Sequence, residues 1–435
     1  MADASCRGLD LPVSEDASVL AQPLAWGHLT LPNRLAAQPM EGCDAHADGS
    51  PGELTRRRYL RFAAGGAGLI WFEATAVVPE GRANPRQLWL HEGNLGVFRA
   101  MVDEARDAAA ETAGARPVFV LQLTHSGRYS RPGGEPAPVI AHHSPVLDPQ
   151  QDLPPDYPVI SDEQLDVLQQ AFVRSALLAA DAGFDAVDLK ACHRYLFNEL
   201  LASHTREGRY GGDLEGRTRM LRETFAKVRD AAGGRVQVTS RLNAYDGIPY
   251  PYGWGVDGRE PPGPDLAEPL RLLRELGELG LNAVNITGGN PYSNAYVNRP
   301  ADKAISRTRT PPEHPLEGVA RLLSLARDLR RGVPDVLMVG SGYSWLREYV
   351  PYFAAGAVRD GWTDIVGLGR GALAYPDFAL DILREGRMHR TKACITCSGC
   401  TQIMRDGGQA GCIVRDAEVY GPIYRAGRDA RGRGR

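Results

Sequence analysis

The chain has 435 residues, of which 43% are hydrophobic and 24% are charged, and these proportions are ordinary for a soluble globular protein. The formal net charge of -3 argues against a general affinity for nucleic acid. The sequence has no run of 18 apolar residues, and its N-terminus lacks the basic and apolar segments of a signal peptide. We therefore expect a cytoplasmic protein with no nucleic-acid or membrane partner.

Eight short apolar runs recur along the chain, separated by longer segments with a helical pattern. Near-continuous apolar runs are typical of strands that are buried on both faces. We expect strands at residues 34–38, 69–72, 118–123, 186–190, 236–241, 283–287, 336–339 and 364–367. We expect helices at residues 54–64, 97–110, 162–182, 217–231, 265–280, 316–330 and 343–355, with Ser161 as the N-cap of the third. This alternation predicts a (β/α)8 TIM barrel of the α/β class.

The remaining sequence divides into a short extension at each end and two long loops. We expect an N-terminal extension (1–23), a barrel (24–390), a cysteine-rich metal- or cluster-binding extension (391–425) and a disordered basic tail (426–435). Residues 126–157 and 243–264 are too long for plain connections and follow the third and fifth predicted strands. They would lie on the rim where barrels carry their active sites.

Glycines and an arginine follow the last two predicted strands. Gly340, Ser341 and Gly342 end the seventh, and Gly369 and Arg370 end the eighth. Loops at these positions are a common phosphate site of barrels, and arginine can grip a phosphate with two parallel hydrogen bonds. The segment GLGRGA also fits a dinucleotide pattern, but no βαβ unit with a suitably placed acidic residue follows it. We therefore predict a phosphate site of the barrel kind.

Four segments resemble motifs of the old yellow enzyme family, whose members are NADH:flavin oxidoreductases. They are NRLAAQPMEG (33–42), QLTHSGR (122–128), HRYLFNELLASHTREGRYGGDLEGRTR (193–219) and GLGR (367–370). The segments occur in the family's order over residues 24–386, and the third is the most specific. The resemblance implies an FMN-binding barrel that passes hydride through the flavin to an activated carbon–carbon double bond, with NAD(P)H as the reductant.

The resemblance also assigns residues to the flavin. Arg241 ends the fifth strand and is expected beside N1 and O2 of the ring, where a cation favours reduced flavin. Gln122 is expected at the pyrimidine edge, and the backbone around Pro39 and Met40 at the other edge. The glycine loops and Arg370 would then hold the FMN phosphate.

Three residues after the fourth predicted strand are expected to act on the substrate. The family places two hydrogen-bond donors there, three residues apart, and in this chain they are Lys190 and His193. Lysine is a departure, because its ammonium is a flexible point charge rather than a planar ring. Tyr195 stands at the position of the proton donor, and its hydroxyl can serve as a general acid. Tyr292 is a candidate for a second donor.

Four cysteines follow the barrel with the spacing C-x2-C-x2-C-x11-C. They are Cys394, Cys397, Cys400 and Cys412, and in a reducing compartment such spacing indicates a metal site. Four thiolates suit either zinc or an iron–sulfur cluster, and the spacing alone does not choose. The resemblance favours [4Fe–4S], because the branch of the family with 2,4-dienoyl-CoA reductase and trimethylamine dehydrogenase has a closely similar spacing. That branch continues into FAD- and nicotinamide-binding domains, which we do not expect here.

The predicted function is an FMN-dependent ene-reductase that acts on a small enone- or enoyl-like molecule. Electrons would come from NAD(P)H or from a separate electron-donor protein, and a homo-oligomer is compatible with the sequence. One alternative is a dehydrogenase or amine-oxidising reaction on the same scaffold. Others are a Schiff-base lyase that uses Lys190 and an electron-transfer protein with no substrate of its own.

Overall fold

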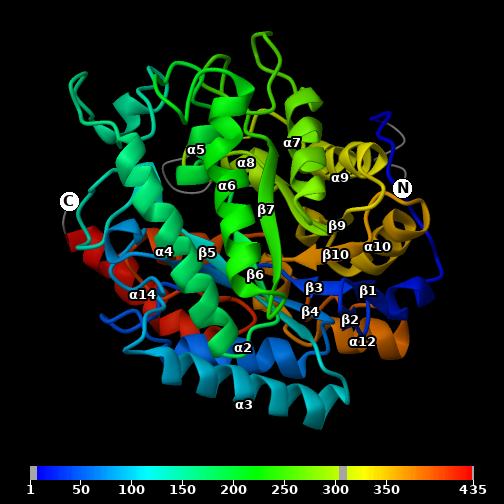
Figure 1. Ribbon diagram of the computed structural model, residues 1–435. Coiled ribbons are helices and arrows are strands. Elements are labelled where there is room, and N and C mark those ends of the chain that lie inside the picture. Colours follow the sequence, from blue (N-terminus) through cyan, green and yellow to red (C-terminus); the bar gives the residue numbers. More distant parts are fainter. Residues whose placement is uncertain (1–6, 303–310, 434–435) are drawn as a thin grey trace.

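The computed structural model describes residues 7–302 and 311–433, and eight parallel strands close into a barrel at its centre (Figure 1). The barrel runs in the order β10-β3-β4-β5-β6-β7-β8-β9, so neighbours in sequence are neighbours in space. All eight predicted strands are confirmed. Their bounds are β3 (Leu35–Ala37), β4 (Leu69–Ala76), β5 (Val118–Thr124), β6 (Ala186–Leu189), β7 (Gln237–Tyr245), β8 (Ala283–Gly288), β9 (Leu337–Gly340) and β10 (Ile365–Leu368).

Long helices form an outer layer around the barrel (Figure 1). They are α2 (Glu53–Ala64), α3 (Leu95–Ala113), α4 (Asp162–Asp181), α6 (Leu214–Ala232), α7 (Ala267–Glu278), α9 (Pro315–Gly332) and α10 (Val350–Arg359). Their buried faces pack on the strands as one continuous hydrophobic core. Within the described residues, no helix combines the length and the apolar character that a membrane crossing requires.

Two helix ends show how the local sequence sets the boundaries. The predicted N-cap is confirmed, because the Ser161 hydroxyl accepts from the Gln164 backbone N–H and the Gln164 side chain accepts from the Ser161 N–H. The helix expected at residues 343–355 is instead divided into the 3-10 helix η5 (Tyr343–Tyr349) and α10. Arg347, with a φ of 55°, interrupts the helical backbone within η5.

A small antiparallel hairpin closes the N-terminal end of the barrel. It consists of β1 (Leu24–Trp26) and β2 (Leu29–Leu31). Trp26 and Leu31 are buried in a hydrophobic cluster with residues from inside the barrel, including Leu69 and Trp71. The opposite end, at the carboxyl ends of the strands, is therefore the one that remains open for a site.

Short helices occupy the connections and the C-terminal region. They are η1 (Ser18–Ala21), η2 (Pro79–Gly81), η3 (Gly127–Tyr129), η4 (Asp148–Gln151), α5 (Leu196–Leu201), α8 (Ala295–Asn298), α11 (Arg370–Ala374), α12 (Phe378–Glu385), α13 (Gly399–Arg405) and the longer α14 (Ala417–Arg433). Figure 1 shows α14 beside α2, where Asp416 accepts from the guanidinium groups of Arg57 and Arg61.

The basic tail differs from the prediction. Residues 426–435 were expected to be disordered, but α14 continues to Arg433, and only residues 434–435 of the tail lie outside the described part. The start of α14 is fixed because Tyr420 packs with Ile403 and Ala410 in a small hydrophobic cluster. The helix propagates from this anchored turn into a segment whose own sequence has no apolar period.

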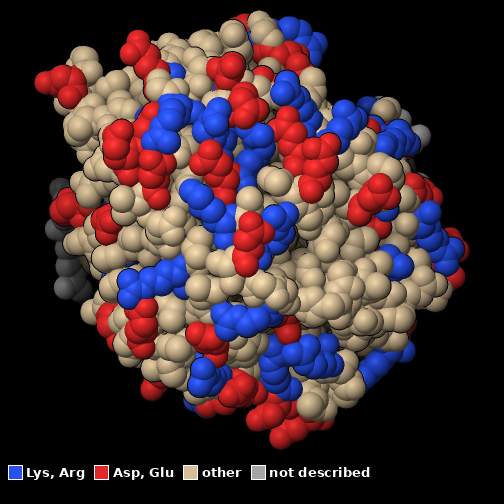
Figure 2. Space-filling model, in the orientation of Figure 1, with Lys and Arg blue, Asp and Glu red and all other residues tan. Residues whose placement is uncertain are grey.

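Charged side chains of both signs are mixed on the face of the molecule in Figure 2. No large region of one sign stands out on this face, in keeping with the net charge of -3.

Candidate active site

A cavity of about 240 Å³ lies at the carboxyl ends of the barrel strands. We call it the mouth cavity. It contains all but one of the residues that the sequence predicts for flavin and substrate, namely Pro39, Met40, Gln122, Lys190, His193, Tyr195, Arg241, Ser341, Gly342, Gly369 and Arg370. The exception is Gly340, which does not line the cavity but whose carbonyl accepts from the Gln38 amide at 3.3 Å.

A buried carboxylate beneath the mouth cavity positions two of these residues. Asp188 accepts from Gln122 Nε2 at 2.6 Å, from the Arg241 backbone N–H at 2.6 Å and from Trp71 Nε1 at 2.8 Å. Burial raises the pKa of Asp188 to about 6, while these hydrogen bonds oppose the rise. The sequence analysis did not single out Asp188, because an acidic residue inside an apolar strand run carries no motif of its own.

Three arginines present unpaired nitrogen atoms at the mouth cavity. The Nε of Arg241, the Nη1 of Arg370, and the Nε and Nη2 of Arg299 are buried without a hydrogen-bond partner among the described residues. Arg370 Nη2 donates to the Pro300 carbonyl at 2.7 Å. Buried donors without acceptors are costly, so this arrangement fits an anionic cofactor such as FMN, with a phosphate at one end and an electron-accepting ring at the other.

Close backbone packing shapes the loops expected at the phosphate. Gly342 has a φ of 99°, and a Cβ there would lie 2.8 Å from the Leu322 side chain. A Cβ on Gly369 would lie 2.9 Å from Met40 Sδ. The Ser341 hydroxyl donates to the Ile286 carbonyl at 2.7 Å, which directs this side chain to the barrel wall. The backbone and the Arg370 side chain therefore remain at this position for an anion.

Lys190 and Tyr195 are brought together by a sharp turn after β6. His193 and Arg194 both have a positive φ, of 64° and 60°, which non-glycine residues seldom adopt. The turn is held because the Arg194 N–H donates to Asn198 Oδ1 at 2.7 Å and its guanidinium pairs with Asp246 at 3.1 Å. As a result, Lys190 Nζ lies 3.5 Å from the centre of the Tyr195 ring.

Tyrosines from three loops meet beside the mouth cavity, and two of them, Tyr195 and Tyr292, line it. The Tyr195 and Tyr292 hydroxyl oxygens lie 3.1 Å apart. The Tyr292 ring stacks on that of Tyr129, with centroids 3.7 Å apart, and the Tyr129 hydroxyl accepts from Asn290 Nδ2 at 2.8 Å. Burial holds the pKa of Tyr195 well above its ordinary value, so its hydroxyl keeps its proton at neutral pH.

His193 is held as a neutral ring. Its Nε2 lies 2.9 Å from Asn298 Nδ2, which can only donate, so Nε2 accepts and the ring proton resides on Nδ1. Burial, together with the positive charges of Arg241, Lys190 and Arg299, holds the pKa of His193 well below 6.5. A neutral imidazole can donate one hydrogen bond without carrying a charge.

Several residues of the mouth cavity were missed by sequence reasoning. Asn298 and Arg299 come from the end of α8, in the connection after β8, and Thr401, Met404 and Arg405 come from α13 in the cysteine-rich extension. These positions carry no motif, so no local signal identified them. The extension, which was expected to be a separate region, thus forms one wall of the mouth cavity.

The four cysteines of the motif surround a second, small cavity, which we call the thiol cavity. Cys394, Cys397, Cys400 and Cys412 all line it as free thiols, and Arg370 lines both this cavity and the mouth cavity. Burial raises the pKa of Cys394 to about 11, while the positive charge of Arg370 opposes the rise. The arrangement suits a group that binds thiolates close to the flavin position.

Another group of possible metal ligands lies outside the cysteine motif. It consists of Asp381, Glu385 and His389, each of which offers one ligand atom, and these three atoms lie within 4.8 Å of one another. Asp381 already accepts from Lys392 at 2.8 Å, so this group has a cation of its own. The four cysteines of the motif lie elsewhere, around the thiol cavity.

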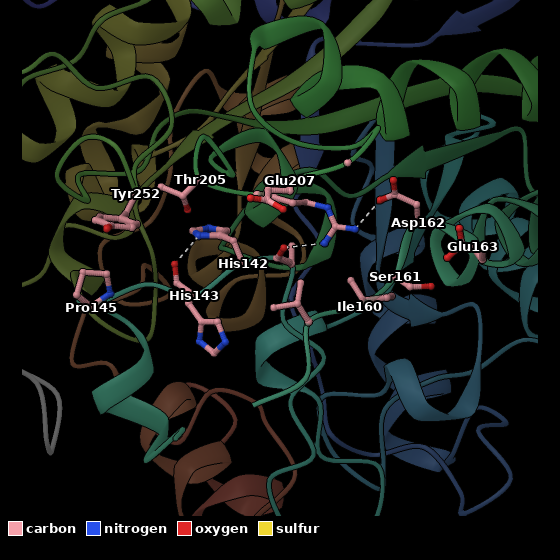
Figure 3. Close-up of a pocket in the computed structure, with 14 residues that line it drawn as sticks. His142, His143, Pro145, Ile160, Ser161, Asp162, Glu163, Thr205, Glu207 and Tyr252 are labelled. Atoms are coloured by element: carbon pink, nitrogen blue, oxygen red, sulfur yellow. Dashed lines mark hydrogen bonds and ion pairs between the residues drawn. The ribbon is translucent and has the colours of Figure 1, made fainter. Parts of the chain in front are cut away.

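A wider hollow of about 760 Å³ lies beyond the rim of the barrel and contains none of the predicted site residues (Figure 3). Arg206 and Asp162, two of its charged side chains, form an ion pair. Arg206 donates to Asp162 at 2.7 Å and to the Ala141 carbonyl at 2.8 Å, and His142 Nδ1 lies 2.9 Å from the His143 carbonyl (Figure 3). We therefore assign the chemistry to the mouth cavity.

The barrel and its mouth bring together the residues expected to hold a flavin, and comparison with known proteins identifies the family. The model of the NADH:flavin oxidoreductase / NADH oxidase family matches residues 19–251, more than half of the chain. The chain belongs to this family.

Its relatives include an NADH oxidase of Thermoanaerobacter brockii, 28% identical over 379 residues, which cover 86% of this chain and 52% of that protein. An NADPH dehydrogenase of Halalkalibacterium halodurans is 30% identical over 267 residues, or 60% of this chain and 70% of that protein. The chain therefore spans about half the length of the first of these relatives.

Solved structures with the same fold include 2-naphthoyl-CoA reductase in complex with 2-naphthoyl-CoA, at a TM-score of 0.71 and 21% identity over 92% of this chain and 57% of that one. Histamine dehydrogenase from Rhizobium sp. 4-9 follows at 0.69 and 20%, over 92% and 52%. Morphinone reductase in complex with tetrahydroNAD has a TM-score of 0.60 and 21% identity, over 84% and 90%.

Proposed function

We propose that this protein is an FMN-dependent ene-reductase that uses NAD(P)H to reduce an activated carbon–carbon double bond in a small molecule. The observation that carries the proposal is the unpaired guanidinium nitrogens of Arg241 and Arg370 in the same cavity as the Tyr195–Tyr292 pair. When bound, FMN supplies the hydride that it has received from NAD(P)H. The remaining tasks fall to the side chains of the chain itself.

The cofactor would be held from three sides. Gln122 and Arg241 bind the polar edge of the ring, and the Asp188 carboxylate keeps Gln122 oriented. The backbone around Pro39 and Met40 supports the other edge of the ring. Arg370 and the backbone of Gly340, Ser341, Gly342 and Gly369 bind the phosphate.

The substrate would be bound through its activating oxygen and protonated by a tyrosine. His193, with its proton on Nδ1, and Lys190 hold the oxygen and thereby draw electron density from the β-carbon. Tyr195 donates a proton to the α-carbon, and the net change is addition of one hydride and one proton across the double bond. Tyr292, 3.1 Å away, orients the Tyr195 hydroxyl. A dehydrogenation would use the same residues in the opposite direction.

We further propose that Cys394, Cys397, Cys400 and Cys412 bind a [4Fe–4S] cluster rather than zinc. Four thiolates suit either group. The position of the thiol cavity favours the cluster, because Arg370 lines both this cavity and the mouth cavity, and a one-electron relay is useful beside a redox cofactor. The cluster would exchange electrons with a separate donor protein, and reduced thiols are in keeping with the cytoplasm.

The absorption spectrum of anaerobically purified protein, combined with metal and sulfide analysis, tests both proposals. We expect flavin bands, iron and acid-labile sulfide, and oxidation of NAD(P)H on addition of 2-cyclohexen-1-one. Folded protein that binds no FMN contradicts the ene-reductase. Zinc without iron contradicts the cluster alone. Borohydride trapping of a carbonyl compound on Lys190 would instead support the Schiff-base lyase.

A further inference from the structure

Lys190 places a buried ammonium group in the mouth cavity without a counter-ion. Its side chain lines the cavity and the residue is only 5% exposed. Within the described residues, Nζ makes neither a hydrogen bond nor an ion pair. It lies over the face of the Tyr195 ring, 3.5 Å from the ring centre. A cation–π contact offsets only part of the cost of burying a charge. The position therefore favours the arrival of an anion.

The carboxylate that could serve as a counter-ion for Lys190 is hydrogen-bonded to another residue. Glu41 is the one carboxylate that lines the mouth cavity in the described part of the chain. Its Oε1 accepts from Asn84 Nδ2 at 2.9 Å, and no ion pair within 4.0 Å joins it to Lys190. Burial raises the pKa of Glu41, although the charge of Lys190 opposes this. Glu41 therefore does not neutralise Lys190 by direct contact.

Other positive charges surround the same position. Burial lowers the pKa of His193, and the positive charges of Arg241, Lys190 and Arg299 lower it further. The proposed function assigns Arg241 to the flavin ring and Arg370 to the phosphate. Lys190 is left over. Arg299, two of whose nitrogens are buried without a partner, lies on the side of Arg370, whose charge lowers the pKa of Arg299 further after burial. The substrate end of the cavity thus carries positive charge that the cofactor does not use.

We propose that the substrate carries a carboxylate conjugated with its double bond, and that Lys190 is the counter-ion that selects this anion over a neutral ketone or aldehyde. This inference rests on the proposed function, because it assumes that FMN occupies the same cavity. It names the substrate class as α,β-unsaturated carboxylates.

The two donors at this position match the two oxygens of a carboxylate. The Lys190 ammonium can pair with one oxygen, and the neutral His193 ring can donate from Nδ1 to the other. A ketone has a single oxygen and no charge to balance the ammonium. Negative charge also grows on the activating group when hydride reaches the β-carbon, and a fixed cation stabilises that charge.

One pair of ligands of similar shape, one charged and one neutral, tests the inference without catalysis. The probes are 3-phenylpropionate and 4-phenyl-2-butanone, which are saturated and cannot be reduced, and binding to the oxidised holoenzyme is followed by the shift in flavin absorbance. A charged hydrogen bond predicts that wild type binds the carboxylate at least about tenfold more tightly. Lys190→Met should abolish this preference and Lys190→Arg should retain it. Lys227→Met, at an exposed position of α6, is the matched control and should behave as wild type.

The outcomes separate the two proposals. Holoenzyme that contains FMN but binds the ketone as tightly as the carboxylate overturns this inference and leaves the ene-reductase in place. Protein that binds no FMN overturns both. The comparison of the two ligands in wild type is decisive by itself, so a Lys190→Met variant that fails to fold does not remove the test.

Discussion

The hydroxyl oxygens of Tyr195 and Tyr292 lie 3.1 Å apart, although 97 positions separate the two residues in the chain. Tyr195 follows β6, Tyr292 follows β8, and the ring that stacks on Tyr292 belongs to Tyr129, which follows β5. Three rim loops thus hold one hydroxyl in place. This arrangement suits proton donation, because the donor must reach a single carbon from a fixed direction.

Removing the Tyr195 hydroxyl should slow substrate reduction without affecting flavin reduction. We expect Tyr195→Phe to lower the rate at which a double bond reoxidises the reduced enzyme by about a hundredfold or more. Tyr292→Phe should have a smaller effect in the same step, because it removes only the partner of the donor. Stopped-flow flavin absorbance measures the two half-reactions separately.

Tyr157→Phe is the control for this pair, because the Tyr157 hydroxyl donates to the Pro138 carbonyl and does not line the mouth cavity. Both half-reactions should keep their wild-type rates. An unchanged reoxidation rate in Tyr195→Phe would show that another group donates the proton.

Loss of the Arg370 side chain should remove the preference for FMN over riboflavin. A charged hydrogen bond to a phosphate contributes about 1.5–3 kcal/mol, so Arg370→Gln should weaken FMN binding by roughly ten- to a hundredfold and leave riboflavin binding nearly unchanged. Quenching of flavin fluorescence on addition of apoprotein gives both dissociation constants. Arg387→Gln, which alters a surface ion pair with Glu385, is the control. A preference for FMN that survives in Arg370→Gln would place the phosphate elsewhere.

Loss of one cysteine of the motif should release the iron. Cys394→Ser should purify with little iron and sulfide and should melt at a lower temperature, because metal binding contributes directly to the stability of the folded state. Metal analysis, sulfide assay and thermal unfolding provide the measurements. Cys6→Ser, outside the motif, should keep the wild-type metal content. If wild-type protein shows four thiols that react freely and contains no metal, the motif has no such role.

The stability of the protein should depend on pH through a buried histidine. Burial lowers the pKa of His125 to about 4, and its Nδ1 accepts from the Gly127 N–H at 3.0 Å. In the unfolded chain the pKa is near 6.5, so between pH 6.5 and 4 the unfolded state takes up a proton that the native state refuses. This contribution to stability is complete above pH 6.5 and decreases as the pH falls. At pH 5 it should be smaller by about 2 kcal/mol.

Urea unfolding of wild type and His125→Gln at pH 7 and pH 5 isolates this effect. Asp188 and Asp246, whose pKa values burial raises to about 6, act in the opposite direction but are present in both proteins. The difference between the two proteins should shrink at pH 5. Equal differences at both pH values would mean that His125 titrates normally.

The sequence by itself determined the barrel, the family and the cysteine motif. Apolar runs are local and mark buried strands wherever they occur, so all eight strands were predictable. The motif residues Gln122 and Arg241 lie within β5 and β7, and Arg370 follows β10. Their meeting in one cavity was predictable from the same alternation, because parallel strands bring their carboxyl halves to one face.

Tertiary structure decided which loops meet over that face. The contact of Tyr292 with Tyr195, the hydrogen bond that fixes the His193 tautomer, and the wall that α13 adds to the mouth cavity all join segments far apart in the chain. The helical course of residues 426–433 was likewise decided by packing at Tyr420. Such contacts depend on how distant segments pack, and no local pattern of residues records that packing.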